Sequence, residues 1–320
     1  MTHSPSGYDA AHRPGGLAVW RRSPLGLLEL RGADRHSFLQ GMVSNDVVTL
    51  APGDACHAAL LDTTGHVLAD LRVLAFPESL VVETSAACFL TLHQTLDKFL
   101  IMEDVTLVDV SDQWVVLSVL GDGAADLGVI PAKRCPLSFP LVPGYDLWFR
   151  PDAAPSVSDA LSKAGAVTLS DSDAEVMRVE AGIPAWGHEL SPSILLPETG
   201  MDDAVSYTKG CYVGQEIVAR LHARGHANRS LRHVLMSQEA PVPPPGATLH
   251  VPEDGPEPGR EIGRVTSAVS SPMLGGRALA LAYVRKEYWE PGTPISVQID
   301  QPGGLAFAFS GEVREQPGKA

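Results

Sequence analysis

The amino-acid sequence predicts an α+β protein of two or three domains that ends in a small antiparallel β-barrel. Its 320 residues are enough to build several apolar cores. Strand-like and helix-like runs alternate between about residues 53 and 131, as in a compact α+β unit. Beyond residue 246, short alternating strands follow one another without a helix between them, which is typical of a small barrel.

The composition narrows the class of protein. Hydrophobic residues make up 44% of the chain and charged residues 19%, which is ordinary for a folded soluble protein. The formal net charge of -14 argues against a general binder of nucleic acids or acidic membranes, because the overall field repels phosphate groups. A site for an anionic ligand therefore needs a local concentration of positive charge.

The sequence shows no pattern typical of a membrane span or a signal peptide. No apolar stretch reaches the roughly 18 residues of a membrane span. Residues 1–16 are polar and rich in Gly, Pro and Ser, so we expect a flexible leader on a cytoplasmic protein. The sparse cysteines form no Cys-x-x-Cys pair, which fits a reducing compartment and predicts no metal site. They are Cys56, Cys88, Cys135 and Cys211.

The first half of the chain contains most of the predicted α+β elements. Phe38, Leu39 and Met42 share one face of a predicted helix that has Asp34 near its start. A second helix is predicted over residues 86–100. Apolar runs predict strands at 17–20, 27–30, 58–61, 67–76, 80–82, 105–110 and 114–120.

The second half contains two predicted connections. Residues 133–143 carry three prolines and read as a linker, followed by a strand at 145–149 and helices at 157–164 and through Met177. The proline-rich run 241–246 predicts the clearest domain boundary. We expect a first α+β domain from 17–52 with 132–240, a second α+β domain from 53–131, and a barrel domain over 246–320. The predicted barrel strands are 247–251, 262–269, 278–284, 295–299 and 305–309.

Cys211 lies in the most informative segment, residues 209–216 (KGCYVGQE). Apolar residues at helical spacing follow it, so Cys211 is expected at or near a helix N-terminus. The helix dipole and neighbouring Lys209 would both favour the thiolate there. The alternative is a buried cysteine that acts only as a small hydrophobic residue.

Basic residues cluster around and after this segment. In so acidic a chain the cluster indicates a local site for carboxylates or phosphates, although a solvated helix face is the alternative interpretation. Its members are Lys209, Arg220, Arg224, Arg229 and Arg232, with His222, His226 and His233 between them. His222 and His226 have metal-ligand spacing, but the metalloprotease Glu is missing and the arginines repel a cation, so no metal site is predicted.

Two carboxylates stand among apolar residues. Glu180 lies at the end of a predicted helix, where it can pair with an arginine or accept two parallel hydrogen bonds from a flat heterocycle. Asp70 interrupts a predicted apolar strand, so it either contacts a substrate nitrogen at an open cavity or lies exposed on an edge strand.

Together these segments resemble the YgfZ-like proteins, a branch of the aminomethyltransferase (glycine-cleavage T-protein) superfamily. Residues 209–216 are similar to the signature octapeptide of that group. The likeness runs from about residue 17 onward, through 30–34, 38–41, 44–47, 61–70, 178–184, 196–198, 263–267, 271–272 and 278–284.

The resemblance implies three domains arranged as a cloverleaf around a central cavity that accepts tetrahydrofolate or a one-carbon derivative. By position, it assigns Glu180 to the pterin ring and Arg220 with its neighbours to the glutamate tail. Tyr212, Gln215 and Asp70 are implied as further folate contacts, and Cys211 as the characteristic thiol of the group. Cys211 and Asp70 are the implied catalytic residues.

The implied function is tetrahydrofolate-dependent support of iron–sulphur cluster assembly or repair, with client or assembly proteins as partners. True aminomethyltransferases carry two adjacent acids where this chain has Ala69 and Asp70, and proton handling at a folate nitrogen needs a carboxylate. Whether the chain turns over a substrate is therefore left open. The alternatives are a folate-dependent aminomethyltransferase or demethylase-type transferase and, as the least favoured, a tRNA-modification factor.

Overall fold

The computed structural model describes residues 6–22, 24–128, 130–136, 142–225, 227–252, 259–300 and 306–315. The chain divides into two compact units. Unit 1 consists of Met1–Thr63, Leu68–Ala174 and Asp203–Gln215, and unit 2 of Thr64–Val67, Glu175–Asp202 and Glu216–Ala320. None of the helices in the described part of the chain combines the length and apolar character needed to cross a bilayer.

The first sheet of unit 1 has five strands in the order β10-β1-β7-β9-β8. Only the β1–β10 pair is parallel. Helix α4 (Ala154–Lys163) covers one face, because Val157 and Leu161 lie four residues apart and pack on the apolar side chains of β7 and β9. The strands are β1 (Ala18–Arg21), β7 (Val115–Leu120), β8 (Lys133–Pro136), β9 (Gly144–Phe149) and β10 (Val167–Thr168).

The second sheet of unit 1 has the order β3-β4-β5-β2-β6. Helix α3 (Ala86–Phe99) buries Cys88, Leu92 and Leu96, which recur every fourth residue. A shorter helix, α2 (Arg35–Met42), follows β2, and α1 (Gly7–His12) precedes β1. The strands are β2 (Leu25–Arg31), β3 (Ala55–Leu61), β4 (Val67–Ala75), β5 (Ser79–Ser85) and β6 (Thr106–Asp109).

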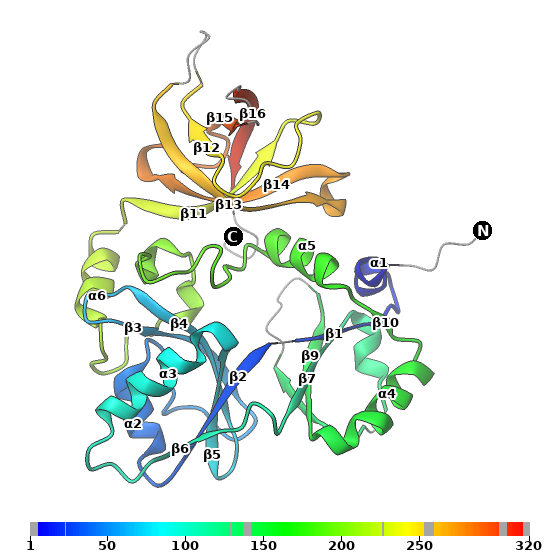
Figure 1. Cartoon of the computed structure of the whole chain (residues 1–320), viewed down its shortest axis with the longest axis vertical. Helices are drawn as coiled ribbons and strands as arrows, with labels where there is room; N and C mark the ends of the chain where they lie inside the picture. Colours follow the sequence, from blue (N-terminus) through cyan, green and yellow to red (C-terminus); the bar gives the residue numbers. More distant parts are fainter. Residues whose placement is uncertain are drawn as a thin grey trace. The chain divides into compact units, whose positions relative to one another are not determined.

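Unit 2 is built on a closed antiparallel barrel with the strand order β11-β14-β13-β12-β15-β16 (Figure 1). Its interior is apolar and includes the fully buried Val234, Leu249 and Ile262. Helices α5 (Asp171–Ala181) and α6 (Gln215–Ala223) precede the barrel in the chain, and α5 begins in unit 1. The strands are β11 (Arg229–Met236), β12 (Thr248–His250), β13 (Glu261–Ser271), β14 (Arg277–Arg285), β15 (Pro294–Asp300) and β16 (Ala306–Arg314).

The α+β class and the terminal antiparallel barrel are confirmed, but two predicted boundaries are corrected. Strand β11 pairs with β14 and β16, so the barrel begins before the predicted start at residue 246. The proline run 241–246 therefore connects two barrel strands, β11 and β12, and does not separate two domains. The boundary at residues 52–53 also cuts across both sheets, since β2 pairs with β5 and β1 pairs with β7. Three domains around a central cavity remain a prediction.

Two buried carboxylates and two largely buried arginines join the two sheets of unit 1. Arg22 follows β1 and Asp146 lies on β9, whereas Arg72 and Glu83 face each other on β4 and β5. Arg22 contacts Glu83 at 2.6 Å and Asp146 at 3.2 Å, and Arg72 contacts the same two carboxylates at 2.8 and 2.5 Å. Ser118 also donates to Asp146 at 2.6 Å. Two cations and two anions thus neutralise one another at a site shielded from water.

This four-charge network predicts a large cost for removing one member. Burial alone would raise the pKa of Glu83, but Arg22 and Arg72 outweigh it and lower the pKa below its ordinary value. We expect Glu83→Gln to lower the free energy of unfolding by about 3–5 kcal/mol, since it leaves buried positive charge uncompensated. Because the folded-state pKa is lowered, the contribution of Glu83 is present at neutral pH and lost as the pH falls into the acid range.

Urea titrations at pH 7 and pH 4 would measure this effect, with the exposed Glu78→Gln as the matched control. Equal midpoints for the two variants at pH 7 would show that the network is not stabilising.

Candidate functional site

The octapeptide segment is anchored to unit 1 by Lys209. Its Nζ donates to the backbone carbonyls of Gln40, Val43 and Asn45 at 2.7, 2.8 and 2.6 Å. Gln40 lies in the last turn of α2 and Val43 is its C-cap residue, so the ammonium caps the negative end of this helix. Burial lowers the pKa of Lys209 to about 8. The side chain therefore serves as a helix cap, with all three of its N–H donors used.

Gly214 allows the segment to pass closely over β3. Its φ of +83° is a left-handed conformation, and an added Cβ would lie 2.5 Å from the Asp62 carbonyl oxygen. The backbone N–H of Val213 also donates to Gly41 at 3.2 Å. Only glycine fits this position without a shift of the backbone.

Cys211 and Tyr212 differ in solvent exposure, and Gln215 is the first residue of the helix that follows them. Cys211 is exposed, which argues against the alternative of a buried structural cysteine. Tyr212 is buried, and burial raises the pKa of its phenol to about 12. Helix α6 begins at Gln215, so Cys211 lies near the helix N-terminus, four residues before its first residue, and not in its first turn. The expected support of the thiolate by Lys209 is also weakened, because that ammonium is bound to carbonyls.

Asp70 is not on an edge strand, because β4 lies between β3 and β5. Its side chain is 36% exposed, and its Oδ1 lies 2.6 Å from His57 Nε2. His57 Nδ1 lies 3.0 Å from Asp203 Oδ2. Burial disfavours a charged imidazole, but Asp70 and Asp203 outweigh it and raise the pKa of His57 to about 10.

Sequence reasoning missed His57 and Asp203. They lie 146 residues apart in the chain, and neither belongs to a motif of recognised chemistry. The one available signal is that His57 is a polar residue immediately before the apolar run 58–61 of the predicted strand.

Glu180 in unit 2 is only 4% exposed. It is the penultimate residue of helix α5, and its Oε1 accepts hydrogen bonds from Ser271 Oγ at 2.5 Å and from the backbone N–H of Met273 at 3.4 Å. Neighbouring Arg178 is bound elsewhere, to Glu189 at 2.8 Å and to Ser267 at 2.7 Å. Among these contacts, Glu180 has barrel residues rather than an arginine as its partners.

The members of the predicted basic cluster have different partners. Arg229 forms two hydrogen bonds of 3.0 Å with Glu198. Arg232 donates to Ser230 at 2.7 Å and its guanidinium lies 4.8 Å from the Trp289 ring. Lys209 caps α2, as described above. The remaining two members are exposed, Arg220 on α6 and Arg224 in the turn that follows it.

The histidines of this stretch are separated as well. His222 is exposed on α6, whereas His233 is buried on β11 and bonds to the Val179 carbonyl at 2.6 Å. Burial lowers the pKa of His233. His226 lies outside the described residues. Within the described ranges, no group of three or more His, Cys, Asp or Glu side chains is placed to hold a metal ion.

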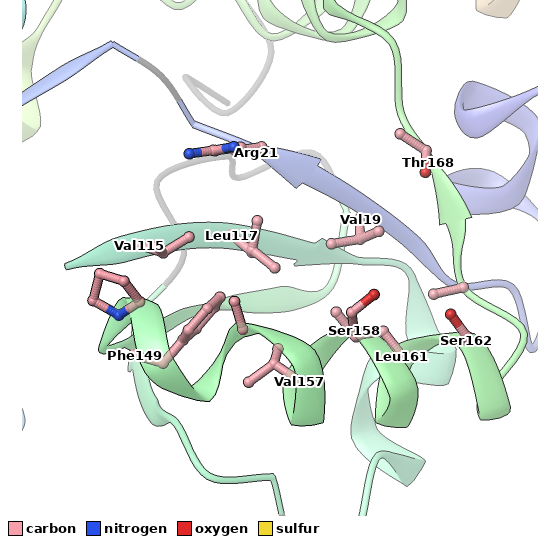
Figure 2. Close-up of a pocket in the computed structure, with 13 residues that line it drawn as sticks. Val19, Arg21, Val115, Leu117, Phe149, Val157, Ser158, Leu161, Ser162 and Thr168 are labelled. Carbon is pink, nitrogen blue, oxygen red and sulfur yellow. The ribbon is translucent and has the colours of Figure 1, made fainter.

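A separate pocket of about 500 Å³ lies in unit 1, between the first sheet and α4. Figure 2 shows Val19 and Leu117 on the strands and Val157 and Leu161 on the helix, with the guanidinium of Arg21 at the rim. None of the predicted site residues lines it.

Two family models match the chain. The GCVT N-terminal domain matches residues 14–128, and the Glycine cleavage T-protein C-terminal barrel domain matches residues 229–306. The second match also places the start of the barrel before residue 246. The chain thus has a GCVT N-terminal domain and a glycine-cleavage T-protein C-terminal barrel domain, whereas its place in the YgfZ-like group remains a prediction.

Curated relatives match over most of their length. A putative chloroplastic transferase of Arabidopsis thaliana is 23% identical, over 90% of this chain and 70% of that protein. The aminomethyltransferase of Bacillus subtilis is 26% identical, over 87% and 82%. That of Saccharopolyspora erythraea is 28% identical, over 86% and 80%.

The fold matches a solved structure, the glycine cleavage system aminomethyltransferase T from Bartonella henselae. The TM-score is 0.82 at 17% identity, with 97% of this chain and 88% of that chain covered. The two chains therefore share a fold.

The cap formed by Lys209 can be tested by Lys209→Met, which keeps the length of the side chain and removes its three donors. We expect the free energy of unfolding to fall by about 2–3 kcal/mol, because three carbonyls lose a charged partner. Thermal and urea denaturation would measure the loss. Lys163→Met, which removes an exposed pair with Asp159, is the control and should cost less than about 1 kcal/mol. Similar losses in the two variants would contradict the capping role.

Proposed function

We propose that this protein binds a reduced folate and acts as a one-carbon transferase of the aminomethyltransferase type. The observation that carries the proposal is the accessible carboxylate of Asp70, held at 2.6 Å by His57 on a chain with both family domains. Proton transfer at a folate nitrogen needs a carboxylate that a ligand can reach. Asp70 meets that need on an inner strand, where the sheet restrains its backbone.

Asp70 is the proposed proton acceptor and donor. Its Oδ1 is already bonded to His57, and an ionised carboxylate has further acceptor sites. These sites would take a proton from the folate nitrogen and return it later. The strand neighbours of Asp70 leave its side chain partly open to solvent, so a ligand can approach.

Glu180 is the proposed contact to the pterin ring. A buried carboxylate is stable only when donors satisfy it, and Ser271 and the Met273 N–H supply two. The ring N–H groups of a pterin would add two more, which the acceptor capacity of a carboxylate allows. The exposed Arg220 and Arg224 are proposed for the glutamate tail, with Tyr212 and Gln215 as further folate contacts.

The accessory role in iron–sulphur assembly, which the resemblance favoured, has no support among the comparisons. The curated relatives described above are named as transferases, which favours the alternative. A single thiol such as Cys211 also cannot hold a cluster. The tRNA hypothesis rests on the basic cluster, of which Arg229 and Arg232 are bound within the barrel unit. The cytoplasmic location remains a prediction.

Calorimetry with tetrahydrofolate tests binding, and a one-carbon transfer assay tests turnover. We expect Glu180→Gln to weaken affinity about 10- to 100-fold, because charged hydrogen bonds to the ring are lost. Asp70→Asn should lower turnover about 100-fold or more while changing affinity less. The exposed Glu239→Gln and Asp112→Asn serve as controls. A wild-type protein that releases no binding heat with millimolar tetrahydrofolate would refute the proposal.

A further inference from the structure

The two ring nitrogens of His57 both face carboxylates. Nε2 lies 2.6 Å from Asp70 Oδ1, and Nδ1 lies 3.0 Å from Asp203 Oδ2. A neutral imidazole donates from one nitrogen only, whereas an ionised carboxylate only accepts. Both contacts are hydrogen bonds at once only if the ring carries two protons. The geometry therefore favours a positively charged His57.

The charged groups that act on His57 come from two other elements. Asp70 lies on the neighbouring strand β4, and Asp203 lies in a short helix, η4 (Asp202–Ala204), ahead of the octapeptide. Together they outweigh the burial of the ring and raise the pKa of His57 to about 10. The imidazolium is thus the expected form throughout the neutral range.

The Asp203 side of this arrangement is also fixed. Asn45 Nδ2 donates to the Asp203 carbonyl at 2.8 Å and Ser44 Oγ to the Ala204 carbonyl at 2.5 Å. Further along, Lys209 anchors the same segment to α2. His57 therefore contacts a restrained segment on one side and the Asp70 carboxylate on the other.

We propose that His57 is a positioning residue: its imidazolium, clamped by Asp203, fixes the carboxylate of Asp70 for proton transfer and joins it to the segment that carries Cys211. The role in turnover rests on the proposed function, whereas the charged clamp itself does not. Above the pH at which the ring loses a proton, one of the two carboxylates loses its donor. The imidazole then no longer links Asp70 to Asp203 through two hydrogen bonds.

The charged clamp is tested by 15N spectra of the imidazole in the free protein. We expect both nitrogens of His57 to be protonated at pH 8, with deprotonation near pH 10. In Asp70→Asn and in Asp203→Asn the titration midpoint of His57 should fall. A neutral ring at pH 8, or a midpoint that neither variant moves, would overturn the inference regardless of any activity.

The positioning role is tested by turnover against pH. We expect His57→Gln to lower kcat about 10- to 100-fold through a misplaced Asp70, with little change in folate affinity, and to remove the alkaline limb of the profile. His93→Gln, on α3 of the same unit, is the control. An unchanged kcat and pH profile in His57→Gln overturns the role. If the wild-type protein binds no tetrahydrofolate, the proposed function is refuted, and the role of His57 in turnover is refuted with it. The 15N spectra then test only the charged clamp.

Discussion

The buried network of Arg22, Arg72, Glu83 and Asp146 is the constraint on which unit 1 depends. It joins two sheets at a point where a single unpaired charge would be strongly destabilising. It also fixes the candidate site, because Arg72 and Asp70 lie two residues apart on β4 and so face the same way. A slip of one residue in the β4–β5 register would separate Arg72 from Glu83 and turn Asp70 to the opposite face. The ion pairs that hold the sheets together thus also hold the carboxylate in place.

Much of the fold could be predicted because apolar periodicity is a local property. The runs that became β4, β5, α3 and β14 were visible in the sequence within a few residues of their ends. Strand β11 was missed because arginine, serine and histidine interrupt its apolar residues, so that it resembled a basic cluster. The proline run was mistaken for a domain boundary for a related reason. Proline reports the conformation of a connection, but not whether the strands on either side share a sheet.

The candidate site could be predicted only in part, because its contacts join distant segments. Glu180 and Asp70 were identifiable as carboxylates in apolar surroundings. Their partners Ser271 and His57 follow from the packing of a helix on the barrel and from strand pairing, which no local pattern encodes. The basic cluster illustrates the converse, because residues that are close in the sequence can have separate partners in the structure. Its residues are close in sequence, yet Arg229 is bound to Glu198 and Lys209 to the end of α2. Proximity along the chain thus did not give these residues a common partner.

Strand geometry also bears on the acid that this chain lacks. Adjacent residues of a strand point to opposite faces, and Ala69 is fully buried whereas Asp70 is partly open. An acid at position 69 would therefore point into the core of the sheet, away from the face on which His57 meets Asp70. Burial of a charge there would need its own partner. The small apolar side chain at 69 stabilises the strand without removing the carboxylate that faces outward. The missing acid is thus a weaker argument against one-carbon transfer than the sequence alone implied, since the open face of β4 keeps the group that proton transfer requires.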